Sequence, residues 1–286
     1  MYRFVAFAIT VIVATASSAF AADLPVKAGP APVAAPVYSW TGFYIGANIG
    51  GGWGDRDVNT VANDPLAVLT FNSLSGGPPP ISFTSSGVVG GVQLGYNWQF
   101  NRNWLAGIEA DFSGSGIDGS GTSSGVINGG LAGLFPFTQT ASEKIRWFGT
   151  VRARLGYLPV DNLLIYATGG FAYGRVEHSA TYINNGPVPL NVTGFGFSYT
   201  CGAFAPCFNG LSNDVSGGWT VGGGIEYAIW QRWTLRAEYL YVSLDSRSVT
   251  QTGVALAVPG NAVSSVNANF DRTTFNVARI GVNYRF

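Results

Sequence analysis

Eight segments of this chain alternate between apolar and polar side chains with a period of two residues. Because successive side chains of a β-strand point to opposite faces, this pattern predicts strands with one apolar and one polar face. Segments of about 10 residues are typical of membrane barrels, although a soluble sandwich alternates in the same way. The segments cover residues 43–53, 88–99, 104–112, 144–157, 163–175, 219–229, 233–243 and 274–286.

Composition distinguishes these two architectures. The chain is 47% hydrophobic and only 10% charged, whereas a soluble domain carries about 25% charged residues. Beyond the N-terminal residues no stretch approaches the ~18 apolar residues of a spanning helix, which excludes a helical membrane protein. The formal net charge is zero, so nothing indicates nucleic acid as a partner. The apolar strand faces therefore predict contact with lipid.

The N-terminus has the layout of a secretory signal peptide. Arg3 precedes an apolar run over residues 4–16, and small residues then lead to an A-x-A cleavage site that ends at Ala21. The apolar run is shorter than the ~20 residues that a spanning helix needs. We therefore predict an exported precursor with a cleaved signal peptide at residues 1–21, a Pro- and Ala-rich periplasmic leader at 22–39 and an outer-membrane barrel at 40–286.

The connections between the expected strands alternate between short and long, as in outer-membrane barrels, where short turns lie in the periplasm and longer loops outside. With a periplasmic N-terminus, eight strands place every short turn inside and every long loop outside. We therefore predict an all-β fold, an eight-stranded antiparallel transmembrane β-barrel. The short connections are residues 100–103, 158–162 and 230–232, and the long ones are 54–87, 113–143, 176–218 and 244–273.

Tryptophan placement supports the barrel over the sandwich. All eight tryptophans, Trp40 included, lie at or just beyond the ends of expected strands. A sandwich core would draw large aromatic side chains toward the middle of its strands, whereas membrane barrels place them in girdles at both membrane interfaces. The residues assigned to the girdles are Trp53, Trp98, Trp104, Trp147, Trp219, Trp230 and Trp233.

Charged side chains of the expected strands share the face opposite the apolar one. A basic side chain on the lipid face would cost about 2–4 kcal/mol near the membrane midplane, so these residues are expected to face the lumen. Two interpretations follow: the charges form a satisfied network that fills the barrel, or a basic-biased lumen passes small anions. We favour the filled barrel, because open pores normally use about 16–18 strands. The expected network comprises Glu109, Asp111, Lys144, Arg146, Arg152, Arg154, Glu226, Arg236, Glu238, Arg279 and Arg285.

Few residues suggest chemistry. The only histidine, His178, precedes Ser179 and lies near Glu177, but adjacent His and Ser side chains seldom form a nucleophile–base pair. We expect no catalytic, cofactor-binding or metal-binding residues. Cys201 and Cys207 lie in an expected surface loop, where an oxidising compartment favours a disulfide over the alternative of a metal pair.

Basic residues near the expected rim have two interpretations. They can contact phosphate groups of lipopolysaccharide, or they are ordinary solvated loop charges. The sequence ranks neither above the other. The residues are Arg56, Arg175, Arg247 and Arg272.

Three short motifs resemble the small outer-membrane proteins of rhizobia, brucellae and their relatives, often called outer-membrane immunogenic or porin-like β-barrel proteins. They are the sequences at residues 22–25 (ADLP), 40–46 (WTGFYIG) and 281–286 (GVNYRF). The resemblance implies eight strands, outer-membrane residence and exposed antigenic loops. Some relatives are described as haemin binders, but no residue pattern in this chain carries that role over. The last segment looks like the signal read by the barrel-assembly machinery, through Ile280, Val282, Tyr284 and Phe286.

Together these observations predict a monomeric outer-membrane barrel with a structural or surface-interaction role, not an enzyme. Its expected partners are outer-membrane lipids and lipopolysaccharide, with the barrel-assembly machinery during biogenesis. One alternative is a low-conductance porin for small polar solutes. Another is binding of haemin or a host surface through the loops.

Overall fold

The computed structural model describes residues 38–73, 77–128, 134–187, 191–192, 197–199, 202–257 and 260–286. The predicted signal peptide and the leader up to residue 37 lie outside the described residues, so both stay predictions. Among the described residues, no helix is both long and apolar enough to span a membrane.

Eight antiparallel strands form a closed ring. Each strand pairs with the next around the ring, and the last pairs with the first through residues such as Ile49 and Ile280. This arrangement confirms the predicted eight-stranded antiparallel barrel. In ring order the strands are β1 (Gly42–Ala62), β2 (Ile81–Gln99), β3 (Trp104–Asn128), β4 (Leu134–Val160), β5 (Leu163–Asn184), β8 (Ala205–Ala228), β9 (Trp233–Leu244) and β12 (Thr273–Arg285).

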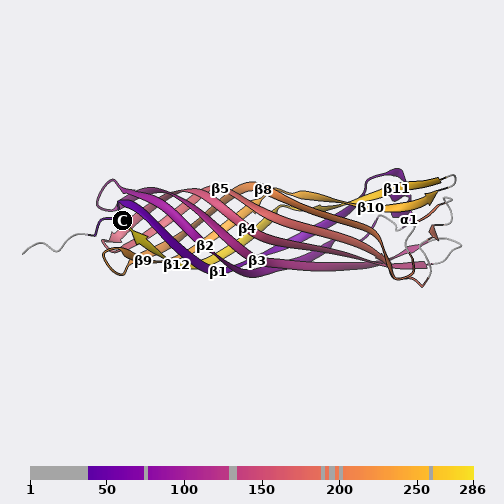
Figure 1. Ribbon diagram of the computed structural model, residues 1–286, viewed down its shortest axis with the longest axis horizontal. Helices are drawn as coiled ribbons and strands as arrows, with labels where there is room; N and C mark the ends of the chain where they lie inside the picture. Colours follow the sequence, from indigo (N-terminus) through magenta and orange to yellow (C-terminus); the bar gives the residue numbers. More distant parts are fainter. Residues whose placement is uncertain are drawn as a thin grey trace, which may run out of the picture. The chain divides into compact units, whose positions relative to one another are not determined.

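The ring continues beyond its membrane-spanning part. There β10 (Arg247–Ala257) and β11 (Gly260–Phe270) take the places of β9 and β12: β11 pairs with the end of β1, and β10 pairs with β11 and contacts β8. Figure 1 shows β10, β11 and the helix α1 at the end of the barrel away from the C-terminus. The short strands β6 (Asn191–Val192) and β7 (Phe197–Tyr199) extend the sheet beside β10.

The long connections consist largely of strand. The sequence predicted loops at residues 113–143 and 176–218, but β3 and β4 are 25 and 27 residues long and pair with each other as far as Asn128 and Leu134. The physical reason is that alternation persists there in a different form. Outward positions are Ser, Thr and Asn instead of apolar residues, so a search for apolar outer faces ended the strands too early.

Two register irregularities lie at the same height of the wall. One residue of β4, Arg146, has no partner in β5, and β3 has its own irregularity between Gly114 and Ile117. An extra residue in a strand reverses which side chains face inward beyond it. The prediction that Lys144 and Arg146 face the lumen is therefore wrong: both side chains are exposed on the outside, and Arg146 is 54% exposed.

The interior is filled in layers, which can be followed along the inward face of β4. From the periplasmic end, this face presents an apolar residue, two arginines and a threonine, two apolar residues, one carboxylate, and then apolar residues with one glutamine among them. Each layer is completed by inward side chains of the other strands. In order, the buried β4 side chains are those of Leu158, Arg154, Arg152, Thr150, Phe148, Ile145, Glu143, Ala141, Gln139, Phe137 and Phe135.

The helix α1 (Pro65–Ser73) packs on the layer farthest from the periplasmic end. Asp64 caps it, because its Oδ1 accepts hydrogen bonds from the backbone N–H groups of Leu66 (2.9 Å) and Ala67 (3.0 Å). Ala67 is buried against Phe135 and neighbouring side chains of the same cluster. The interior of the barrel is therefore covered at its outer end by part of the β1–β2 connection.

Candidate functional site

The middle of the membrane-spanning lumen is organised around Arg152. Its Nη2 lies 2.5 Å from Glu109 Oε1 and 2.9 Å from Asp111 Oδ2, and its Nη1 lies 3.0 Å from Glu238 Oε1. The Arg152 side chain is 0% exposed. One guanidinium group on β4 thus contacts three carboxylates, two from β3 and one from β9.

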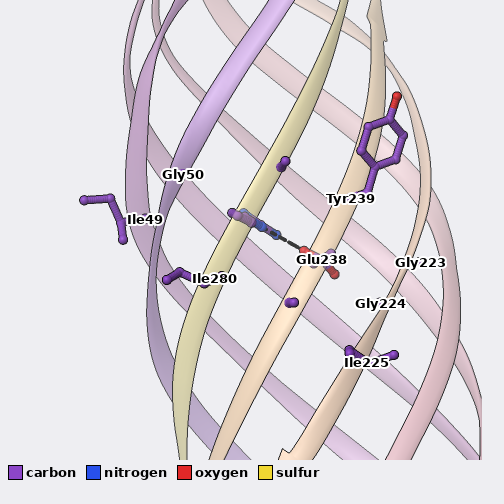
Figure 2. Close-up of a pocket in the computed structure, with 11 residues that line it drawn as sticks. Ile49, Gly50, Gly223, Gly224, Ile225, Glu238, Tyr239 and Ile280 are labelled. Carbon is purple, nitrogen blue, oxygen red and sulfur yellow. Dashed lines mark hydrogen bonds and ion pairs between the residues drawn. The ribbon is translucent and has the colours of Figure 1, made fainter.

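Three further arginines complete the network. Arg236 contacts Glu109 (2.6 Å) and Glu238 (2.6 Å), and Arg279 contacts Glu238 (2.6 Å) and Asp111 (3.2 Å). Arg154 forms an ion pair with Glu226. Figure 2 shows the ion pair of Glu238 on the inner face, while Ile49, Ile280 and Ile225 point to the other side of the wall. Four arginines thus face four carboxylates, so the charges of the layer balance.

Two tyrosines that the sequence analysis did not assign to the network belong to it. Tyr44 donates a hydrogen bond to Glu109 (2.6 Å), and Tyr166 donates one to Glu238 (3.0 Å). The guanidinium carbon of Arg154 lies 3.8 Å from the centre of the Tyr166 ring, in a cation–π contact. The sequence could have predicted the role of Tyr44, because the alternation places this residue on the polar face of its strand.

Neutral side chains fill the remaining lumenal space at this level. Gln93 donates to Asn283 (2.8 Å), which in turn donates to Glu226 (2.9 Å). A Cβ at Gly46 would collide with the amides of Asn283 and Gln93, and one at Gly95 would collide with the Tyr44 ring. The glycines on this face therefore leave room for larger side chains from opposite strands.

Arg285 is apart from this network. It lies at the periplasmic end, where its guanidinium carbon is 4.8 Å from the Tyr38 ring centre and 5.6 Å from that of Trp40. Trp40 is fully buried there, next to Leu105 and Leu164. Trp40 therefore covers the end of the lumen and is not part of a girdle.

Six of the seven tryptophans assigned to the girdles lie on the outer wall, and Trp230 lies in the exposed turn between β8 and β9. Trp104 packs against Tyr157 (5.3 Å between ring centres) near the periplasmic end, and Trp219 packs against Tyr241 (5.5 Å) at the other end of the spanning segment. Six of the seven are exposed and Trp147 is half-buried. The C-terminal residues Ile280, Val282 and Phe286 are exposed on the same wall, and Tyr284 is half-buried beside Trp233 (5.1 Å).

A second buried polar group lies in the extracellular part, where the prediction for Arg56 is wrong. Arg56 does not lie on the rim, because it is 2% exposed and its Nε lies 2.5 Å from Glu143 Oε1. Glu143 Oε2 accepts from His178 Nε2 (3.2 Å) and from the Thr273 hydroxyl (3.0 Å). Burial works against the charged form of Glu143, but the hydrogen bond of His178 and the charge of Arg56 outweigh it, so the pKa of Glu143 lies below its ordinary value.

His178 and Ser179 point to opposite faces of β5. His178 is buried in the lumen, whereas the Ser179 hydroxyl lies on the outer wall, 2.7 Å from that of Ser142. The other basic residues expected at the rim are exposed: Arg175 donates to Asn213 (2.7 Å), Arg247 donates to Ser216 (3.1 Å), and Arg272 lies between β11 and β12.

Cys201 lies outside the described residues, so the expected disulfide with Cys207 stays a prediction. Cys207 lies in β8, not in a loop, and is buried beside Phe208. The described residues contain no cluster of three or more His, Cys, Asp or Glu side chains that could hold a metal ion.

Comparison with known proteins assigns the chain to a family. The model of the "outer membrane protein beta-barrel domain" family matches residues 8–286. The chain belongs to this family. Its barrel is therefore an outer-membrane barrel, and the placement of the aromatic girdles at the two membrane interfaces stays a prediction.

Curated relatives in the family cover most of the chain. The 31 kDa outer-membrane immunogenic protein of Brucella melitensis biotype 1 is 36% identical over 282 residues, which is 95% of this chain and 95% of that protein. The 22 kDa outer membrane protein of Rhizobium leguminosarum bv. viciae is 29% identical over 212 residues, or 74% of this chain and 68% of that protein. Among solved structures, OprG of Pseudomonas aeruginosa matches with a TM-score of 0.40 at 13% identity, covering 86% of this chain and 96% of that one.

Proposed function

We propose that this outer-membrane protein is a sealed barrel with a structural and surface-interaction role, and that it is not an enzyme. The observation that carries the proposal is the Arg152 layer, in which the interacting side chains are at most 3% exposed. A solute that crossed this layer would have to separate several ion pairs at once. Removing one partner of a buried pair costs about 3–5 kcal/mol, because the other charge is left uncompensated.

Two apolar layers support the proposal. On the extracellular side of Arg152, Phe148 and Phe275 pack edge to face (5.3 Å between ring centres) and both are 0% exposed. On the periplasmic side, Trp40 packs with Leu158 and Leu164 across the end of the barrel. An ion would lose its hydration in either layer, which favours the sealed barrel over the low-conductance porin.

In the proposed role, interactions with other molecules take place on the outer wall and not in the lumen. Among the described residues, the strands extend far beyond the outer aromatic girdle and present a polar face to the medium. His178 does not support haemin binding, since its side chain is buried and its Nε2 is hydrogen-bonded to Glu143. We retain the outward residues Ile280, Val282, Tyr284 and Phe286 as the proposed assembly signal.

Single-channel recording of the refolded mature barrel in a planar bilayer tests the proposal. A heat-dependent gel shift should first establish that the protein is folded, and a sixteen-stranded porin in the same membrane serves as the positive control. We expect folded protein without conductance steps. Discrete steps whose size changes in Arg152→Ala would mean that the lumen conducts, and the porin would replace the sealed barrel.

A further inference from the structure

One sector of the outer wall, formed by β3, β4 and β5, changes its chemistry in a fixed order along the strands. On the outward face of β4, Val151 lies in the lipid-facing part and is followed by Trp147, then by Arg146 and Lys144, and then by Ser142. The order from the membrane outward is therefore apolar, aromatic, cationic and hydroxyl-bearing.

The neighbouring strand β5 follows a similar order, with a carboxylate between its cation and its hydroxyl. Its outward residues are Phe171, Tyr173, Arg175, Glu177 and Ser179, counted away from the membrane. The register places Arg175 opposite Trp147, Glu177 opposite Lys144 and Ser179 opposite Ser142. The register therefore pairs hydroxyl with hydroxyl and carboxylate with cation, and it places Arg175 beside the aromatic Trp147.

The aromatic residues fix the height of the cations relative to the membrane. The Trp147 ring lies 5.4 Å from that of Phe112 and 6.1 Å from that of Tyr173, so the three form a continuous patch of the outer girdle. Aromatic girdles mark the boundary between hydrocarbon and headgroups. Arg146 and Arg175, which follow directly, therefore lie at the level of lipid phosphates.

The charges at this level are only partly paired. Arg146 Nη2 lies 2.6 Å from Glu177 Oε2, while no carboxylate of the described residues is within ion-pair distance of Lys144. Asp118 of β3 lies opposite Lys144 in the register. Three cations and two carboxylates leave this sector net positive, whereas Asp55 and Asp57 hold the corresponding outward positions of β1.

Above the cations, hydroxyl groups form a regular array across the three strands. The register places residues of β3, β4 and β5 side by side in rows, and all of them are exposed or half-buried. Adjacent strands are about 4.8 Å apart, so the hydroxyl groups of a row have a near-constant spacing. The rows are Ser120, Ser142 and Ser179, followed by Thr122, Thr140 and Thr181.

We propose that this β3–β4–β5 sector binds a phosphorylated glycolipid of the outer leaflet, which we take to be lipopolysaccharide. Its acyl chains would pack on the wall below Trp147, its phosphates would contact Lys144, Arg146 and Arg175, and its sugars would hydrogen-bond to the hydroxyl rows. A glycolipid embedded in the outer leaflet carries its acyl chains, phosphates and sugars in this order from the membrane outward. Each part would therefore lie beside side chains of matching chemistry. The inference rests on the proposed surface role but not on the state of the lumen.

Binding to immobilised lipopolysaccharide tests the proposal with the refolded full barrel in detergent micelles. We expect the triple variant Lys144→Gln, Arg146→Gln and Arg175→Gln to bind about tenfold more weakly, equivalent to ~1.4 kcal/mol. The matched controls Arg102→Gln, at an exposed periplasmic turn, and Arg247→Gln, on another part of the wall, should change binding less than twofold. An equal loss in triple variant and controls, or no loss in the triple variant, would overturn the proposal.

The ligand is varied to test the contribution of each chemical group. Dephosphorylated lipopolysaccharide should bind wild type as weakly as the intact ligand binds the triple variant. Replacing Thr122, Thr140 and Thr181 by Val should weaken binding of the intact ligand about threefold but leave binding of a form truncated to the lipid anchor unchanged. Phosphatidylglycerol that binds as tightly as lipopolysaccharide would refute the sugar contacts. Because each variant is checked by gel shift and binding is independent of conductance, a conducting lumen would overturn the proposed sealing without affecting this result.

Discussion

The membrane-spanning and extracellular parts of this barrel share β1, β2, β3, β4, β5 and β8 but have contrasting interiors and exteriors. Between the girdles the outer wall is apolar and the lumen holds Arg152 with its carboxylates. Beyond the girdle the wall carries Ser, Thr and Asn, and the interior is dominated by apolar layers such as the one around Phe270. The medium outside the wall thus determines which kind of side chain each face can carry.

The inversion follows from where each part gains its free energy. Lipid contact removes the hydrophobic reason to bury apolar side chains inside, so the spanning lumen can be filled by polar groups provided that they satisfy one another. Water outside the extracellular part restores the hydrophobic effect, and an apolar interior then stabilises that part as in a soluble protein. The register irregularity at Arg146 lies at the boundary between the two.

The largest expected effect tests whether the charge layer holds the spanning part together. Arg152→Met should destabilise the barrel by about 3–5 kcal/mol, because Glu109, Asp111 and Glu238 lose a shared cation in a buried site. The measurement is urea unfolding of the refolded protein in micelles. Arg102→Met, the same substitution at an 83% exposed side chain, should stay within about 0.5 kcal/mol. Equal stability of Arg152→Met and wild type would contradict a structural role of this layer.

A pair of substitutions on one strand tests the inversion of the outer wall directly. Ile108 and Thr122 both point outward from β3, one toward lipid and one toward water. Ile108→Arg should cost about 2–4 kcal/mol, because it places a charge near the membrane midplane. Thr122→Arg should be within about 0.5 kcal/mol of wild type, as an ordinary surface change. Equal costs in urea unfolding would mean that both positions face the same medium.

The same inversion explains how far the sequence could predict the fold. Apolar-out alternation predicted eight strands and their pairing order, because it applies wherever lipid touches the wall. It failed beyond Trp147, where the outward residues are polar and the strands continue. Residues such as Thr122 and Thr140 have the composition of a loop, and only their pairing in the register identifies them as strand.

The candidate site was predictable only in part for a related reason. Alternation of inward and outward positions along each strand correctly grouped Arg152 with Glu109. It assumed, however, that every residue of a strand is paired. One unpaired residue in β4 reverses the alternation beyond it, so that Lys144 points outward. Arg56 was expected at the rim because a charged residue in a predicted loop is normally solvated. Its burial depends on Glu143, which is 87 residues away in sequence, and no local pattern reports such a contact.

The smallest effect concerns the one buried carboxylate described in the extracellular interior. The pKa of Glu143 lies below its ordinary value despite burial, owing to His178 and Arg56. A carboxyl group with a lowered folded-state pKa stabilises the fold above its ordinary pKa, and this contribution is lost as the pH falls through the lowered value. The extracellular part should therefore become less stable on acidification, as Glu143 takes up a proton and its interactions with Arg56 and His178 weaken.

His178→Phe tests this and measures the contribution of the histidine. The variant loses a hydrogen bond to a charged group, worth about 1.5 kcal/mol at neutral pH, while Phe can still pack on Phe270. With less to lower the pKa of Glu143, the acid-induced loss should begin at higher pH than in wild type. Hydrogen exchange of the β4 amides near Ser142 is the measurement, and amides near Ala153 in the membrane serve as an internal reference. A parallel change at both places would show that acid acts on the whole barrel, so that the two interiors respond as one. A change confined to Ser142 is expected, because each interior is stabilised by its own set of contacts.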